Sequence, residues 1–142
     1  MQKKQNNLGI GVDIEETERF KNLDIFKNVA FLHQIYTKKE LSYCFKKAKP
    51  YIHLAGRFVA KEAVFKALTS IGKSRGISLK KIEISVNIDN VPKVVVHGFK
   101  GKKLEVNLSI SHCKSQAIAF AIVVSYEKFK RKDNSKQSKQ HI

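Results

Sequence analysis

Alternation of apolar and polar positions predicts a β-strand near the start of the chain. In residues 8–14, LGIGVDI, apolar side chains recur at every second position, with two glycines and Asp13 between them. Asp13 therefore shares a face with Gly9 and Gly11, where the missing side chains let a ligand or another element approach the backbone closely. The pattern leaves two roles open for Asp13: it either faces a ligand or caps the following turn.

A period of 3.6 residues governs residues 56–68, GRFVAKEAVFKAL, and predicts a helix. Two charged pairs occur at a spacing of four residues, Glu62 with Lys66 and Arg57 with Lys61. An exposed pair of this kind stabilises a helix by only about 0.3–0.5 kcal/mol. Two phenylalanines lie between the pairs, which favours a cleft or a subunit contact over open water. The remaining face is small and apolar, and we expect it to be buried; it holds Val59, Ala60, Ala63, Val64, Ala67 and Leu68.

Residues 37–50, TKKELSYCFKKAKP, predict a second helix. Thr37 and Glu40 have the spacing of a capping box, in which each residue binds the backbone N–H of the other. An apolar stripe follows at helical spacing, and Pro50 is expected to end the helix.

Strands dominate the second half of the chain. Alternation from Ile82 to Ile88, followed by the turn sequence DNVP, predicts a hairpin. Two further strands are predicted at 105–112 and 117–126, and the second is apolar on both faces, as in a central strand. Helices that precede strands indicate the α+β class, with N-terminal helices packed on a mainly antiparallel sheet.

Composition indicates one soluble domain with a strong positive charge. We expect the domain at residues 1–126 and a basic, flexible tail at 127–142. Cys44 and Cys113 match no metal-ligand or disulfide-scaffold spacing, which predicts a reduced, cytoplasmic setting. No apolar run is long enough to cross a membrane. The formal net charge of +16 predicts a polyanionic partner, and a small basic nucleic-acid-binding protein is the alternative hypothesis.

A serine and histidine cluster lies at residues 108–112, LSISH. A serine hydrolase would also need an orienting carboxylate and usually a strained turn around the serine, and neither accompanies Ser109 or Ser111. We therefore exclude serine hydrolysis. His112 ends a predicted strand, where binding a ligand and capping a turn are equally compatible with the pattern.

Three segments in the same order and spacing resemble the holo-acyl-carrier-protein synthases. They are residues 9–20, 56–68 and 108–112, and the second is the most specific. These synthases are the short bacterial branch of the 4′-phosphopantetheinyl transferases. The resemblance implies an α+β fold and a homotrimer with active sites at subunit interfaces. It also implies transfer of the phosphopantetheine arm of coenzyme A to a serine of apo-acyl carrier protein, with Mg²⁺ as cofactor and adenosine 3′,5′-bisphosphate as the second product.

The resemblance assigns the metal and the chemistry to three residues. Asp13 and Glu62 match the family's metal ligands, and carboxylate oxygens are the donors that Mg²⁺ prefers. Glu62 also matches the residue that takes the serine proton. Lys66 matches the residue that assists the leaving phosphate, so Glu62 and Lys66 are the expected catalytic residues.

Four further residues match the family's substrate contacts. Arg57, Lys61 and His112 are expected to contact the nucleotide of coenzyme A. Arg19 matches an arginine that binds the carrier protein. Carrier proteins of this kind are strongly acidic, which accounts for a basic enzyme. The resemblance implies no nucleic-acid or membrane partner.

Overall fold

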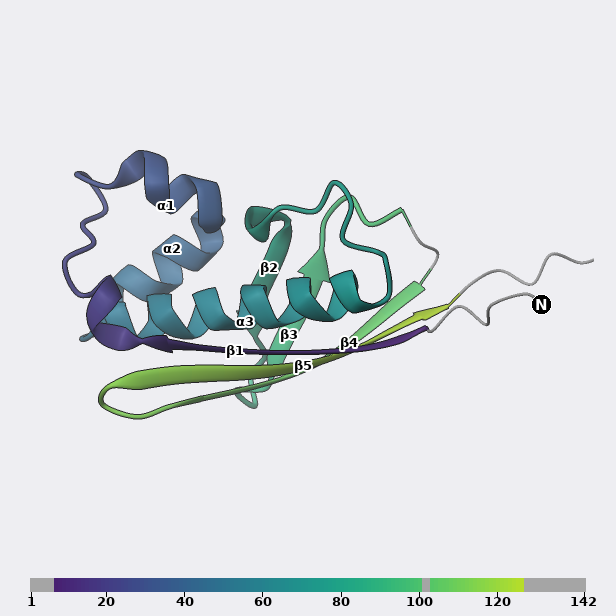
Figure 1. Ribbon diagram of the computed structural model, residues 1–142. Helices are drawn as coiled ribbons and strands as arrows, with labels where there is room; N and C mark the ends of the chain where they lie inside the picture. The colour runs from purple at the N-terminus through teal and green to yellow at the C-terminus, as the bar shows by residue number, and fades with distance from the viewer. Residues whose placement is uncertain (1–6, 101–102, 127–142) are drawn as a thin grey trace, which may run out of the picture.

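The computed structural model describes residues 7–100 and 103–126, and the predicted tail at 127–142 lies outside them. The fold is α+β, as expected (Figure 1). Its elements in chain order are β1 (Leu8–Glu16), the 3₁₀ turn η1 (Thr17–Phe20), α1 (Val29–Ile35), α2 (Lys38–Phe45), α3 (Pro50–Ser70), the 3₁₀ turn η2 (Leu79–Lys81), β2 (Ile82–Val86), β3 (Pro92–Val96), β4 (Lys103–His112) and β5 (Gln116–Tyr126).

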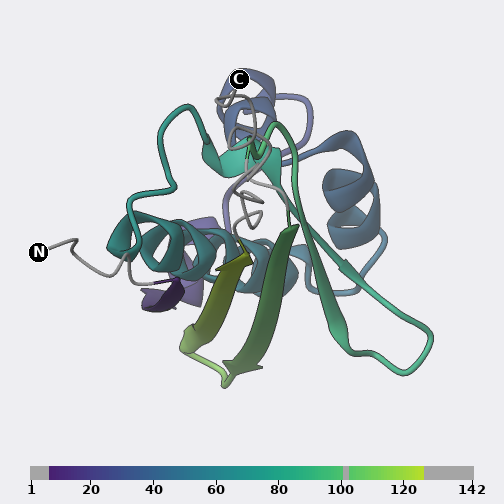
Figure 2. The same cartoon turned by 90° about the vertical axis from the view of Figure 1, so that its right-hand side faces the viewer.

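Two antiparallel sheets flank the long helix α3. One has the strand order β1-β5-β4, and the other is the hairpin of β2 and β3. Strand β5 is therefore central, as its apolar character on both faces predicted. Figure 1 shows α3 lying along the three-stranded sheet, with α1 and α2 over its N-terminal half. Figure 2 shows β4 and β5 side by side and the β2–β3 hairpin beside β4.

The contact between α3 and β1 is close because two glycines face the helix. A Cβ atom on Gly11 would lie 2.0 Å from the backbone oxygen of Ala63, and one on Gly9 would lie 2.2 Å from that of Ala67. The facing positions of β5 are also small or β-branched; they are Ala117, Ala119, Ala121 and Val123. Another element was expected to approach these glycines closely, and in the structure that element is α3.

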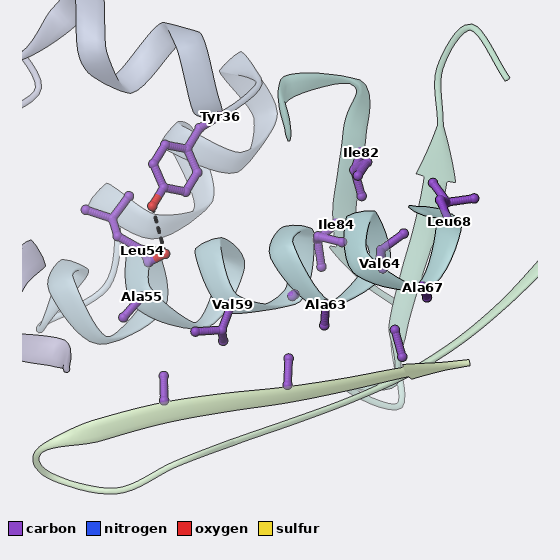
Figure 3. Close-up of a cluster of buried hydrophobic side chains, with 14 of the residues drawn as sticks. Tyr36, Leu54, Ala55, Val59, Ala63, Val64, Ala67, Leu68, Ile82 and Ile84 are labelled. Atoms are coloured by element: carbon purple, nitrogen blue, oxygen red, sulfur yellow. Dashed lines mark hydrogen bonds between the residues drawn. The ribbon is translucent and has the colours of Figure 1, made fainter. Parts of the chain in front are cut away.

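The core lies between α3, the sheets and α2 (Figure 3). All six residues of the predicted apolar face of α3, from Val59 to Leu68, are fully buried. Tyr36, at the end of α1, is also buried, and its hydroxyl donates to the backbone oxygen of Leu54 at 2.9 Å. This hydrogen bond ties the α1–α2 corner to the N-terminal half of α3.

The apolar side chains of β1 point away from the core, unlike those of an ordinary half-buried strand. Gly9 and Gly11 are buried against α3, whereas the apolar side chains of this strand point outward. The outer face of the sheet also exposes two residues of β5, so its large exposed apolar side chains are Leu8, Ile10, Val12, Ile14, Ile118 and Phe120. Their exposed fractions run from 40% to 56%. A contiguous apolar surface of this size is typical of a protein interface.

Two predicted boundaries are wrong. Pro50 does not end α2 but occupies the first turn of α3, where its missing N–H would have no helical partner in any case. Helix α3 thus starts six residues earlier than the helical pattern indicated. Ile88 is not in a strand, because β2 ends at Val86 and the turn leaves Ile88 97% exposed. The capping box is confirmed, with Thr37 and Glu40 bonded reciprocally.

Candidate active site

The close packing of α3 on β1 brings a lysine of the helix onto a carboxylate of the strand. The ammonium of Lys66 lies 2.9 Å from Asp13 Oδ1 and 3.1 Å from the backbone oxygen of Val12. The side chain of Asp13 is only 13% exposed. Its second oxygen, Oδ2, is buried and has no hydrogen-bond partner among the described residues. A buried carboxylate oxygen without a partner is costly, which indicates that a ligand completes this site.

Glu62 stands beside this pair. Burial raises the pKa of Glu62 and the negative charge of Asp13 raises it further, whereas Lys66 lowers it. The hydrogen bond to Asp13 is the main cause of a raised pKa at Lys66. Two carboxylates that disfavour each other's charge form a site where a cation is stabilised.

The carboxylates fit a Mg²⁺ ion. This metal is typically held by one or two carboxylates, with substrate phosphate and water as its other ligands. Asp13 supplies the unpartnered oxygen, and Glu62 supplies a second hard donor. Within residues 7–100 and 103–126, no three His, Cys, Asp or Glu side chains gather as a metal site, so an ion here would depend on substrate oxygens.

Glu62 and Lys66 lie four residues apart on α3, but among the described residues they do not form an ion pair with each other. Lys66 pairs with Asp13 instead, and none of the ion pairs within the described residues involves Glu62. The carboxylate of Glu62 is therefore open to an incoming ligand rather than occupied by its helix neighbour.

A separate basic group lies at the N-terminal half of α3. The guanidinium of Arg57 lies 4.4 Å from the ring centre of Tyr43, and within the described part of the chain its buried Nε has no hydrogen-bond partner. His53 packs edge-on against the same ring. The pKa of His53 is lowered by burial first, and then by the charges of Lys47, Arg57 and His112. His112, at the exposed end of β4, therefore lies in this group.

The basic group borders a hollow on α2. The hollow has a volume of about 550 Å³ and is lined by Lys38, Lys39, Ser42, Tyr43, Lys46 and Lys47. Among residues 7–100 and 103–126, no acidic side chain lines it. Such a concentration of positive charge around aromatic surface is suited to a phosphate-bearing ligand.

Sequence reasoning missed His53, Tyr43 and Lys47. His53 lies four residues before Arg57, so it extends the same strip of α3 by one turn. The spacing of four residues between His53 and Arg57 could have identified His53, but the predicted helix began at Gly56.

Lys61 is not at a ligand-accessible surface, which contradicts the expected contact with nucleotide phosphates. Its side chain is fully buried, and its ammonium lies 2.8 Å from Glu40 Oε2 and also donates to the backbone oxygens of Leu79 and Ile82. Burial lowers the pKa of Lys61, and the charge of Glu40 opposes that effect. Glu40 also accepts from the N–H of Ile84 at 2.7 Å. The pair joins α2, α3 and β2 within the core.

Arg19 lies at the surface just after β1. Its side chain is 63% exposed, and Nη1 lies 2.5 Å from Glu15 Oε2. The guanidinium is therefore exposed enough for a large partner to reach it. Within the described ranges, no helix combines the length and the apolar character that crossing a bilayer requires.

The structure thus presents two groups of charged side chains, a carboxylate pair that fits a metal ion and a basic group suited to phosphates. A sequence profile of the 4′-phosphopantetheinyl transferase superfamily matches residues 9–122, and the chain belongs to this family.

Relatives and solved structures agree with this assignment. The chain is 44% identical over 115 residues to a holo-(acyl-carrier-protein) synthase of Thermodesulfovibrio yellowstonii, covering 81% of this chain and 96% of that protein. It is 48% identical over 118 residues to the synthase of Chlamydia muridarum, covering 80% and 92% of the two chains. The fold is similar to a Bacillus anthracis synthase solved in complex with CoA (3′,5′-ADP). That match has a TM-score of 0.67 and 30% identity, and it covers 83% of this chain and 96% of the other.

Proposed function

We propose that this protein transfers the 4′-phosphopantetheine arm of coenzyme A to a serine of apo-acyl carrier protein. The products are holo-acyl carrier protein and adenosine 3′,5′-bisphosphate. The observation that carries the proposal is the buried, unpartnered oxygen of Asp13 beside Glu62 and Lys66, in a chain of this family. The proposed setting is the cytoplasm, where the free thiols of Cys44 and Cys113 stay reduced.

The carboxylates and Lys66 have separate roles in the reaction. When bound at Asp13 and Glu62, Mg²⁺ would stabilise the negative charge that develops on the pyrophosphate. Glu62 accepts the proton of the carrier serine, directly or through a water molecule, as the serine oxygen attacks the β-phosphorus. Because no ion pair within the described residues involves Glu62, its carboxylate is available to take this proton. Lys66 moves from Asp13 to the leaving phosphate, which its ammonium stabilises.

Arg57 and His112 hold the phosphates of the nucleotide. The unpartnered Nε of Arg57 provides a buried donor, and His112 contributes at the exposed end of β4. His53, with a lowered pKa, remains neutral near pH 7 and can accept or donate a hydrogen bond there. Lys61 has no part in this contact, since its donors are already engaged in the core.

The active molecule is a homotrimer. The exposed apolar face of the three-stranded sheet is covered by further copies of the chain, which removes that surface from water. The positions of the two groups support the same arrangement. Asp13 lies on β1 and His112 on β4, at opposite edges of the sheet with β5 between them, so the strands alone separate them by about 10 Å. Neighbouring copies can each supply one group to a shared site.

The carrier protein binds at the surface that includes Arg19. An exposed arginine suits the carboxylates of an acidic protein, and the net charge of +16 steers such a partner toward the enzyme.

A transfer assay tests the proposal. The protein is incubated with coenzyme A, Mg²⁺ and an apo-acyl carrier protein, and the carrier is weighed by mass spectrometry. The expected result is a mass increase of one phosphopantetheine group, which EDTA abolishes and excess Mg²⁺ restores. A carrier of unchanged mass, together with tight and salt-sensitive binding to generic duplex DNA, would support the nucleic-acid alternative instead.

A further inference from the structure

Glu15 occupies the same face of β1 as the proposed metal ligand Asp13. The two residues are two positions apart in the strand, and their cross-strand partners on β5, Ala117 and Ala119, are both buried. The side chain of Glu15 is 20% exposed, and its Oε2 contacts Arg19. Glu15 therefore lies between the carboxylate pair and the arginine to which we assign the carrier protein.

The charges at this edge of the sheet are linked in pairs. Lys66 is bound to Asp13, and Arg19 is bound to Glu15. Glu62 has no ion-pair partner among the described residues. Glu15 is close enough to act on this centre, because side chains two positions apart on one face of a strand are separated by only about 7 Å, and Asp13 is the nearest such neighbour of Glu15 toward the centre. While Arg19 is bound to Glu15, its positive charge offsets part of the negative charge that Glu15 places near the centre.

We propose that Glu15 couples carrier-protein binding at Arg19 to divalent-cation binding at Asp13 and Glu62. The proposal rests on the function assigned above. An acidic partner that draws the guanidinium of Arg19 away leaves the charge of Glu15 unopposed beside the carboxylate pair. The added negative charge favours a divalent cation, so the carrier tightens the metal site. By thermodynamic linkage, the cation tightens carrier binding by the same factor.

A simple surface ion pair would behave differently. Such a pair changes stability by about 0–1 kcal/mol and has no effect on ligands elsewhere. Glu18 provides the matched control, because it lies in the same segment and forms a comparable pair with Lys21 at 3.6 Å. Its side chain is 75% exposed, and it lies in η1, beyond the strand face that carries Asp13 and Glu15. Glu18→Gln removes the same charge without touching the proposed coupling.

Calorimetric titration of Mg²⁺ into the full-length protein measures the coupling directly. The dissociation constant is determined with and without a saturating apo-acyl carrier protein whose acceptor serine is changed to alanine, so that no transfer occurs. The carrier should tighten Mg²⁺ binding by about fivefold in the wild type and in Glu18→Gln. In Glu15→Gln the carrier should change the dissociation constant for Mg²⁺ by less than about twofold. An equal effect of the carrier in Glu15→Gln and the wild type would overturn the proposal.

A carrier-free experiment separates this proposal from the proposed function. Arg19→Gln frees the charge of Glu15 without any partner, so its Mg²⁺ affinity alone should exceed that of the wild type by about fivefold. The double variant Arg19→Gln with Glu15→Gln should lose that gain. Wild-type affinity in Arg19→Gln would refute the role of Glu15 even if the transfer assay succeeds. The predicted gain in a protein that fails the transfer assay would uphold the coupling and reject only the assigned reaction.

Discussion

The backbone contact between β1 and α3 should tolerate no side chain at Gly11. In Gly11→Ala the new Cβ would lie 2.0 Å from the backbone oxygen of Ala63 and 2.7 Å from the backbone nitrogen of Ala67, so no rotamer change relieves the clash. Restoring an ordinary contact of 3.4 Å requires α3 and β1 to separate by more than 1 Å along this line. Overpacking typically lowers the free energy of unfolding by 1–3 kcal/mol. Because both contacting groups here are backbone and cannot turn aside, we expect a loss of about 3 kcal/mol or more.

The same displacement moves Glu62 away from Asp13. A misplacement of about 1 Å can lower turnover by about 10²-fold, so Gly11→Ala should lose both stability and activity. Urea unfolding followed by circular dichroism measures stability at one fixed protein concentration, since assembly would otherwise shift the midpoint.

Gly56→Ala is the matched control. Its Cβ would meet only Ile110 Cγ2, at 3.7 Å, and the position lies inside α3. Alanine should stabilise the helix there by about 0.5–1 kcal/mol. A free energy of unfolding for Gly11→Ala within about 0.5 kcal/mol of the wild-type value would refute the close-contact argument.

Three further predictions follow from burial and charge. Lys61→Met should lower the free energy of unfolding in urea by about 3–5 kcal/mol, because it leaves the carboxylate of Glu40 buried without its cation. A stable variant with weakened coenzyme A binding would instead support a contact between Lys61 and the nucleotide phosphates. Iodoacetamide at pH 8 should alkylate the exposed Cys113, whose pKa is lowered by hydrogen bonds around Ser115. It should spare Cys44, because burial raises the pKa of that thiol to about 12. Peptide mapping that finds Cys44 modified first would contradict this prediction. Ile10→Glu, on the exposed face of β1, should change the mass measured by light scattering from that of a trimer to that of a monomer, whereas an unchanged trimer would exclude this face as the subunit contact.

Local patterns were sufficient for several elements. The apolar spacing from Val59 to Leu68 identified the buried face of α3. In a helix that packs on one side, apolar residues recur with the helical period of 3.6 residues. The reciprocal hydrogen bonds of Thr37 and Glu40 depend on residues only three apart. Asp13 beside two glycines predicted a close approach, and the structure supplies α3 as the approaching element.

Other features depend on partners that are distant in the sequence. An alternating strand has two faces, and only the position of α3 decides that the glycine face of β1 is the inner one. The family resemblance implied that Lys61 contacts nucleotide phosphates, whereas its burial depends on a carboxylate from α2 and carbonyls from η2 and β2. The pairing of Lys66 with Asp13, rather than with Glu62, likewise results from the α3–β1 contact.

The rate of phosphopantetheine transfer by Glu62→Gln, relative to the wild type, tests the central claim most directly. Both proteins are assayed at saturating coenzyme A, Mg²⁺ and apo-acyl carrier protein, with the adduct measured by mass spectrometry. Since Glu62 is open to ligand rather than paired along α3, the change should leave thermal unfolding near that of the wild type while lowering the rate by about 10²-fold or more. Equal rates for the two proteins, or no adduct with the wild type, would contradict the assignment of Asp13 and Glu62 as the reactive centre.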